Sequence, residues 1–307
     1  MRTTYPAGLV ILPLAFSIPL FAQPGESGMA FLKLGISGRG VGMADAMSAL
    51  VTGAAATHYN PAGLLPHPDG PLTSQIMFMH KEWIQDTRTE FLGGAIPLNH
   101  DNAIGGSINS TTVSDIELRT RPGPPEGTFT ARNFSAGLSY AHRLTPEIGV
   151  GITGRFLYEK ILIDEASGFA LDVGGMWNTP VENLTVGAAL SNLGEMSDLR
   201  NESTTLPALL RLGPAYAVRL IDTQISAVIG LDLLRILPEK RNYLNLGGEF
   251  IINRVISARG GYQFGSEGRG LSLGLGVQHG IIALDYAFAK IASDLGDGHT
   301  LSLAINL

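Results

Sequence analysis

The sequence contains no cysteine and comparatively few charged residues. Of its 307 residues, charged ones make up 16%, against about 25% in an average soluble domain. An exported chain without cysteine has no disulfide bonds to stabilise it. The formal net charge of −6 gives no support to nucleic-acid binding. We therefore expect no nucleic-acid partner.

Motifs for catalysis and metal binding are also missing. The sequence has no His-Glu-x-x-His, and residues 38–42 (GRGVG) match neither a dinucleotide nor a P-loop motif. The seven histidines lack the spacing of metal ligands. We expect a protein that is not an enzyme, with no catalytic residues, no metal and no cofactor.

Long apolar runs are absent beyond the first residues of the chain. Residues 9–21 are largely apolar, follow a basic residue and precede Ala22, which together predict a secretory signal peptide over residues 1–22. An uncleaved anchor is the alternative, but Pro13 and Pro19 fit a membrane helix badly. With no later helical span in sight, a bilayer-spanning mature protein has to be a closed barrel, because open sheet edges leave backbone groups unpaired in lipid.

The last part of the chain alternates between bulky apolar residues and small or polar ones. In residues 271–277 leucine and valine share one face while serine and glycine share the other, and residues 282–288 and 301–307 repeat the pattern. A period of two indicates β-strands. A bulky apolar face opposite a small or polar face is typical of a lipid-facing barrel. The alternative, a soluble exported β-sandwich or lectin-like binding module, would carry charged outer faces.

Similar strand-like stretches recur through most of the chain. We count about fourteen, an even number as in bacterial barrels, beginning near Leu72, Thr87, Asn102, Thr128, Glu147, Gly168, Asn183, Leu206, Thr223, Asn242, Arg254, Gly270, Ile281 and His299. The sequence thus predicts an all-β fold, a transmembrane antiparallel β-barrel over residues 71–307. Polar or Pro/Gly-rich composition predicts longer connections at residues 119–127, 194–205, 235–241 and 292–298, and tight ones at 144–146, 178–180 and 265–268.

Residues 23–70 lack this alternation and are rich in glycine and alanine. Within them, residues 42–56 have the composition of a short helix beginning near Asp45, which Gly53 would weaken. Asn60, Pro61, Ala62 and Gly63 follow as turn signals. We expect a compact segment that is not a strand, with a flexible periplasmic arm as the alternative.

The small and polar strand face also carries charge. An arginine on the lipid face at mid-depth costs about 2–4 kcal/mol, so we place these residues in the lumen: Arg155, Glu159, Asp172, Arg211, Asp232, Glu249, Arg259 and Asp285. They form either a structural network that neutralises itself or part of a transport or docking path.

Aromatic residues lie near several expected strand ends. Tyr140, Trp177, Tyr243, Tyr262, Tyr286 and Phe288 are candidates for interfacial girdles. Ordinary core aromatics are the alternative.

The N-terminal region resembles that of a known outer-membrane family. Residues 28–35 (GMAFLKLG), 38–46 (GRGVGMADA) and 59–64 (YNPAGL) are similar to the opening of the PorV/PorQ proteins, although Ala44-Asp45 replaces the usual Gly-Gly. The Asn-Pro-Ala-Gly element also resembles the hatch of the wider FadL-like superfamily of long-chain fatty-acid transporters. The resemblance implies a fourteen-stranded barrel in the bacterial outer membrane, with residues 23–70 as a hatch inside the lumen and the turn at Asn60 fixing it.

Two roles follow from this resemblance. PorV/PorQ proteins dock exported cargo or secretion-machinery partners in type IX secretion, whereas FadL-like proteins pass hydrophobic small molecules through the barrel wall. The first role is the main expectation and the second its alternative; outer-membrane lipid is the surrounding partner in both. Transport needs an apolar lumen pocket, which Phe31, Leu34, Met43, Met47 and Leu50 are placed to line.

Overall fold

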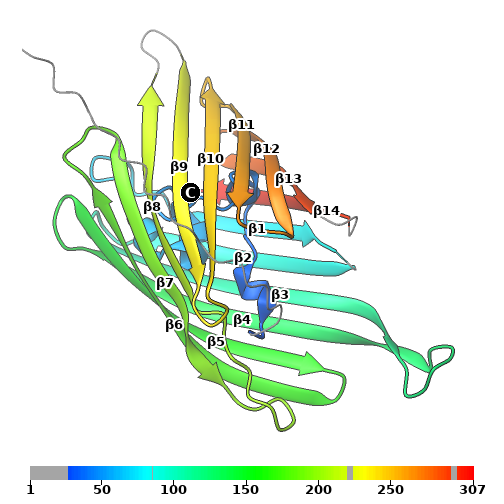
Figure 1. The fold of residues 1–307 in the computed structure, drawn as a ribbon. Helices are drawn as coiled ribbons and strands as arrows, with labels where there is room; N and C mark the ends of the chain where they lie inside the picture. The colour runs from blue at the N-terminus through cyan, green and yellow to red at the C-terminus, as the bar shows by residue number, and fades with distance from the viewer. Residues whose placement is uncertain (1–26, 85, 220–223, 292–295) are drawn as a thin grey trace, which may run out of the picture.

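The chain folds into a closed antiparallel barrel of fourteen strands, as the alternation predicts (Figure 1). The computed structural model describes residues 27–84, 86–219, 224–291 and 296–307, so the expected signal peptide lies outside the described residues. The strands are β1 (Gln75–Glu82), β2 (Thr87–Pro97), β3 (Asn102–Leu118), β4 (Gly127–Arg143), β5 (Ile148–Ile161), β6 (Asp164–Asn178), β7 (Leu184–Met196), β8 (Leu209–Arg219), β9 (Ile225–Ile236), β10 (Arg241–Ile252), β11 (Ile256–Phe264), β12 (Arg269–His279), β13 (Ile282–Ile291) and β14 (Asp297–Asn306). Each pairs with its neighbours in sequence, and β1 pairs with β14 to close the barrel.

Two local expectations were wrong. The strand expected near Gly168 begins at Asp164, because β5 and β6 continue their pairing to a two-residue turn in which Leu162 has a left-handed φ of 56°. The longer connection expected at residues 235–241 is instead the tight turn 237–240, because β9 and β10 remain paired as far as Ile236 and Arg241.

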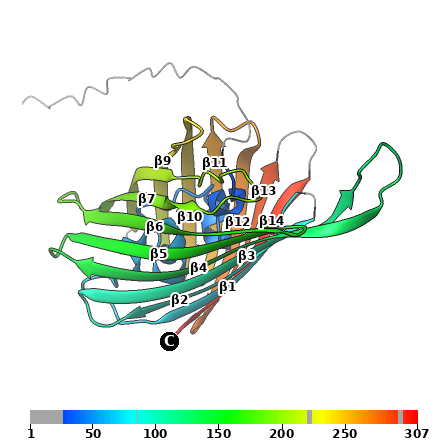
Figure 2. The same cartoon turned by 90° about the horizontal axis from the view of Figure 1, so that it is seen from below.

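The two ends of the barrel differ in their connections (Figure 2). At the short-turn end, where β1 starts and β14 stops, strands are joined by segments such as residues 98–101, 144–147 and 253–255. At the opposite, long-loop end lie the segments 119–126 and 197–208. In bacterial outer-membrane barrels short turns face the periplasm and long loops face the outside.

Side chains alternate between lumen and exterior along each strand. Leu273 and Leu284 are 50% and 45% exposed on the outer wall, where hydrocarbon would cover them. Of the aromatic residues expected in girdles, Tyr140, Trp177, Tyr262 and Tyr286 are exposed. Tyr243 differs: it packs against Leu209, Leu234 and Ile236, because it lies in phase with the inward residues of β10.

The segment before β1 fills the lumen (blue in Figure 1). It contains η1 (Ala30–Lys33), α1 (Gly38–Gly42), η2 (Gly53–Ala55), α2 (Ala56–Tyr59) and η3 (Pro61–Leu64), and we call residues 27–66 the plug. The helix expected over residues 42–56 does not form. Helix α1 ends at Gly42, and left-handed φ angles at Ala44 (51°) and Asp45 (60°) turn the chain away. None of the helices in the described ranges is long and apolar enough to cross a membrane.

Candidate functional site

The plug fits against lumen positions that have no side chain. A Cβ at Gly247 would lie 2.4 Å from the Met43 carbonyl oxygen, and one at Gly151 would lie 2.5 Å from the Pro61 carbonyl carbon. Real Cβ atoms do not approach so closely, so glycine is required where the plug backbone meets the wall. Between plug and wall lies an apolar cluster that includes Ile36, Val51, Met77, Met79 and Phe91.

A buried charge cluster surrounds Asp45 in the plug. The Tyr59 hydroxyl donates to Asp45 Oδ1 at 2.6 Å, and Arg269 of β12 forms an ion pair with Asp45 Oδ2. Lys81 of β1 donates to the Gly35 carbonyl oxygen at 2.5 Å. Strands β1 and β12, which are separated by β14 and β13 in the closed barrel, thus hold the same stretch of plug by charge-assisted bonds.

Burial and nearby charges set the protonation states of Asp45, Tyr59 and His58. Burial would raise the pKa of the Asp45 carboxyl, but the charges of Arg269 and Lys81 and the Tyr59 hydrogen bond outweigh it and hold that pKa well below its usual range. Burial and the Asp45 charge raise the pKa of Tyr59 well above its usual value. Burial, together with the charge of Arg155, holds the pKa of His58 well below its usual value. The cluster is therefore an ionised carboxylate beside a neutral tyrosine and a neutral histidine.

A second chain of ion pairs joins the plug to β10, β11 and β13. Arg39 of α1 pairs with Glu249 at 2.8 Å, Glu249 pairs with Arg259 at 2.6 Å, and Arg259 pairs with Asp285 at 2.6 Å. Three of the charges placed in the lumen by sequence are thus neighbours, and Arg39 was missed.

A third contact lies where the β6–β7 ladder is irregular. Arg155 pairs with Asp172 at 2.6 Å and donates to the Thr57 carbonyl oxygen at 2.5 Å. Asp172 also accepts a 2.7 Å bond from the Asn192 backbone N–H. Asn192 has a φ of 61°, and the register shifts between Leu171 and Val173, as at a β-bulge. Arg155 therefore links the plug to the irregular part of the wall.

The Asn-Pro turn and Asp232 hold the middle of the plug. Asn60 Nδ2 donates to the Ser48 and Gly175 carbonyl oxygens at 2.7 and 3.0 Å, while its Oδ1 accepts from the Ala62 N–H at 3.2 Å. Asp232 accepts the backbone N–H groups of Met47 and Ser48 at 3.0 and 2.8 Å. Pro61, Ala62 and Gly63 are buried in η3.

The remaining two charged positions, Arg211 and Glu159, lie apart from these ion pairs. The Arg211 guanidinium lies 5.5 Å from the centre of the Tyr59 ring, and Glu159 is buried on β5 opposite Asn133 and Ala166. The eight residues thus do not form one network. They lie in separate clusters, most of which contact the plug.

The five residues suggested for an apolar pocket do not gather around one cavity. Phe31 packs at the long-loop end with Leu157 and Leu206. Met43 and Met47 belong to the cluster between plug and wall, with Leu50 packed against it, and Leu34 is only partly buried. Of the five, only Met47 lines the lumen cavity of about 640 Å³ at the short-turn end, whose lining includes Arg39, Glu249 and Asp285. That cavity is unsuited to an apolar ligand.

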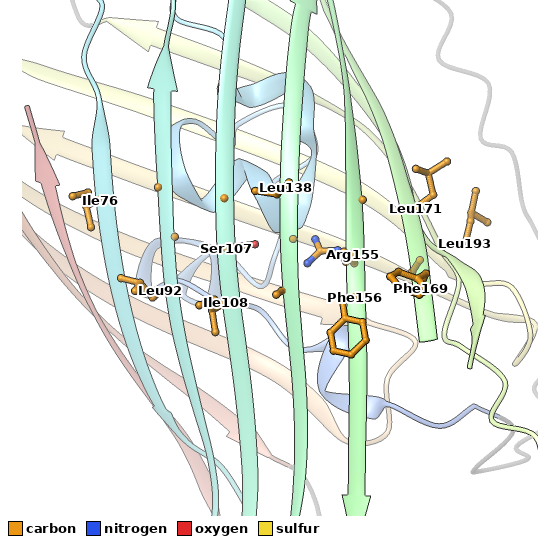
Figure 3. Close-up of a pocket in the computed structure, with 17 residues that line it drawn as sticks. Ile76, Leu92, Ser107, Ile108, Leu138, Arg155, Phe156, Phe169, Leu171 and Leu193 are labelled. Atoms are coloured by element: carbon orange, nitrogen blue, oxygen red, sulfur yellow. The ribbon is translucent and has the colours of Figure 1, made fainter. Parts of the chain in front are cut away.

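A larger concavity lies on the outer wall instead (Figure 3). This groove has a volume of about 1040 Å³ and runs across the outward face from β1 to β7. Leu138 and Phe169, 78% and 72% exposed, stand up beside it. Gly106 and Gly154 leave its floor low: a Cβ at Gly154 would meet nothing within 4 Å. Its apolar side chains are Ile76, Leu92, Ile108, Leu138, Phe156, Phe169, Leu171 and Leu193.

Sequence reasoning missed four of the groups that hold the plug: Arg39, Asp45, Lys81 and Arg269. Lys81 lies in phase with Met77 and Met79, and these methionines look like lipid-facing residues although they point inward. Arg269 has the parity of outward Leu271, but a register shift between Arg269 and Ser272 turns it inward. Strict alternation cannot locate a residue beyond a bulge.

Comparisons with known proteins identify the fold. No protein-family model matches the chain, and no curated protein does. The Pseudomonas putida toluene transporter TodX has a TM-score of 0.60 at 12% identity, covering 89% of this chain and 97% of its own. The CymD monoaromatic hydrocarbon channel gives 0.56 at 13% identity, covering 89% and 96%. A Pseudomonas aeruginosa FadL homologue gives 0.51 at 13% identity, covering 88% and 98%. The chain has the fold of the FadL-like outer-membrane barrels.

Proposed function

We propose that this protein passes hydrophobic small molecules across the outer membrane. The observation that carries the proposal is the apolar groove of about 1040 Å³ on the membrane-facing wall, in a barrel that shares its fold with a toluene transporter and a monoaromatic hydrocarbon channel. A groove of this size is at the upper end of the roughly 300–1,000 Å³ of small-molecule sites.

The route we propose leads from the lumen through the wall. Leu171 and Leu193 line the groove outside, next to the bulge at Asn192, while Arg155 joins this part of the wall to the plug inside. Because a bulge interrupts ladder hydrogen bonds, the wall opens here at lower cost than along a regular ladder. A shift of the plug that releases Arg155 from Thr57 would then connect lumen and groove.

Filling the groove tests this function. Gly154→Leu places a side chain on the groove floor without displacing a neighbour. Gly260→Leu is the matched control, because Gly260 is outward on β11 and its Cβ would first meet Leu273 at 3.9 Å. In reconstituted vesicles, Gly154→Leu should slow uptake of a fluorescent hydrophobic probe at least about tenfold, as loss of about 1.4 kcal/mol would, and the control should not. Equal uptake by both variants would contradict the proposal.

Docking of exported proteins, the role implied by the PorV/PorQ resemblance, is the competing proposal. Its support is the loop of residues 119–126, which extends beyond the barrel at the long-loop end (Figure 2). Under this proposal, shortening that loop weakens retention of envelope proteins in a pull-down, while polar substitutions at Phe31 and Met43 leave retention unchanged. Under the transport proposal, the loop variant retains full uptake.

A further inference from the structure

A row of charged side chains crosses the outer wall toward the long-loop end. Strand register pairs Arg88 of β2 with Thr112 of β3, and Thr112 with Arg132 of β4. Arg132 in turn pairs with Lys160 of β5. Neighbouring strands are about 4.8 Å apart, so the two arginine backbones lie roughly 10 Å apart. Two long side chains at this spacing can converge on one group above Thr112.

Neither arginine has an ion-pair partner among the described residues, whereas the nearby carboxylates contact other side chains. Lys160 pairs with Glu165 at 2.5 Å, and His80 lies 2.7 Å from Glu90 and 3.7 Å from Glu82. Among the described residues, no carboxylate lies within ion-pair distance of Arg88 or Arg132, and both are exposed. This row therefore presents two free guanidinium groups at the edge of an apolar wall.

The apolar groove begins four residues further along the same strands. On β2, Arg88 precedes groove residue Leu92, and on β4, Arg132 precedes Ala136. Four residues of strand span about 13 Å, and arginine side chains extend along apolar surface toward a polar layer. The cationic pair and the groove are thus two parts of one surface.

We propose that this surface binds a membrane lipid with a phosphate headgroup. The phosphate lies between Arg88 and Arg132, whose planar guanidinium groups each match a phosphate in two-pronged geometry. The acyl chains lie in the groove, on the floor that Gly106 and Gly154 leave open. The groove is shared with the proposed transport, but this site goes beyond it, because the arginines that hold the phosphate are not on the route.

Lipid retention measures this binding directly. The protein is purified in detergent, titrated with phosphatidylglycerol and with diacylglycerol of the same acyl chains, and bound lipid is counted by native mass spectrometry. We expect phosphatidylglycerol to be retained in preference to diacylglycerol. Arg88→Ala with Arg132→Ala should weaken that retention at least about tenfold, since each lost charge-assisted bond contributes about that factor. Arg235→Ala is the matched control, because Arg235 is exposed near the same end, on β9 across the barrel.

The outcomes separate a lipid site from simpler explanations. Equal retention by the double variant and its parent, or an equal loss with Arg235→Ala, overturns the proposal. Gly154→Leu should also weaken retention; if it has no effect, the arginines bind a free anion and not a lipid. Heat-shifted mobility on gels checks that each variant still forms the barrel. Uptake of the hydrophobic probe by the arginine variants should match that of the parent, so this proposal and the transport proposal can fail independently.

Discussion

Glycines on the two faces of the barrel wall have opposite surroundings. Gly247 faces the lumen, where a Cβ would collide with the Met43 carbonyl oxygen at 2.4 Å. Gly248, the next residue, faces outward, and a Cβ there would find only the Val228 carbonyl oxygen at 3.9 Å. At the inner glycine, the plug backbone occupies the space that a side chain would need, whereas at outer glycines such as Gly154 that space is open. The same residue type serves close packing inside and a groove outside.

Charges follow the same division. On the lumen side, Arg269, Lys81 and Arg155 have partners in the plug. On the outer side, Arg88 and Arg132 lie toward the long-loop end, and no carboxylate among the described residues is within ion-pair distance of either. A buried charge must be paired to be tolerated, whereas a charge at the edge of a bilayer can be paired by lipid. The three inner cations thus have their partners within the protein, whereas the two outer arginines are available to a partner from the surroundings.

Removing the Asp45 charge should disturb the inner face most. Asp45→Asn leaves Arg269 and Lys81 buried without a counter-charge, and breaking such a buried pair costs about 3–5 kcal/mol. We expect protease cleavage within residues 27–66 in the folded, detergent-solubilised variant, where the parent resists. Arg269→Ala with Asp45→Asn should recover part of the loss.

The pH dependence of this effect has a definite sign. The folded-state pKa of Asp45 is depressed, so its contribution is fully present above the unfolded carboxyl pKa of about 3.9 and is lost as pH falls below it. The difference between parent and Asp45→Asn should therefore shrink below about pH 4. If the difference in stability between the parent and Asp45→Asn is as large at pH 3 as it is above pH 4, Asp45 is not ionised in the folded protein.

An arginine on the outer face should be the next most costly change. Leu284→Arg places a charge against lipid at a position that is 45% exposed, at about 2–4 kcal/mol near mid-depth. Urea unfolding in lipid vesicles measures the loss. If Leu284→Arg inserts as well as the parent while Asp285→Leu fails, the assignment of inner and outer faces is reversed.

Paired valine substitutions compare the two faces within one strand. Gly247→Val should cost about 1–3 kcal/mol through overpacking against the plug. Gly248→Val should be within about 0.5 kcal/mol of the parent, as at an unencumbered surface site. Thermal midpoints from the gel mobility shift measure both. Similar losses at the two positions would mean that the plug does not occupy the inner glycine.

The smallest expected effect concerns His58 in the plug. Burial holds its pKa well below its unfolded value of about 6.5. The unfolded state therefore binds a proton that the folded state does not, and stability is complete above pH 6.5 and falls below it by up to about 1.4 kcal/mol per pH unit. In His58→Gln, the thermal midpoint should fall less between pH 6.5 and pH 5.5 than it does in the parent. The same slope in parent and variant would assign the decline to other groups.

The route of the plug could not be predicted from sequence. Asp45 meets Arg269, and Lys33 meets Glu239 at 2.7 Å, although each pair is far apart in the chain. These pairs cannot be predicted from a local pattern, because the helices of the plug are too short to show a sequence period that would indicate where their side chains point. The composition of residues 23–70 predicted only a compact segment without strands, and its division from the signal peptide stays a prediction.

By itself the sequence determined that the chain forms a closed barrel of about fourteen strands. A side-chain period of two divides each strand into two faces, and the bulky apolar face is turned to lipid in most strands. Backbone groups in a bilayer need partners, so the sheet has to close. Only the tertiary structure decided which inward residues bind the plug. It also decided that small outward residues on β2 to β5 lie side by side and form the floor of a groove. Those features depend on register between strands, on the bulges at Asn192 and Arg269, and on the path of the plug. Each of these is set by the packing of distant segments, which no local pattern contains.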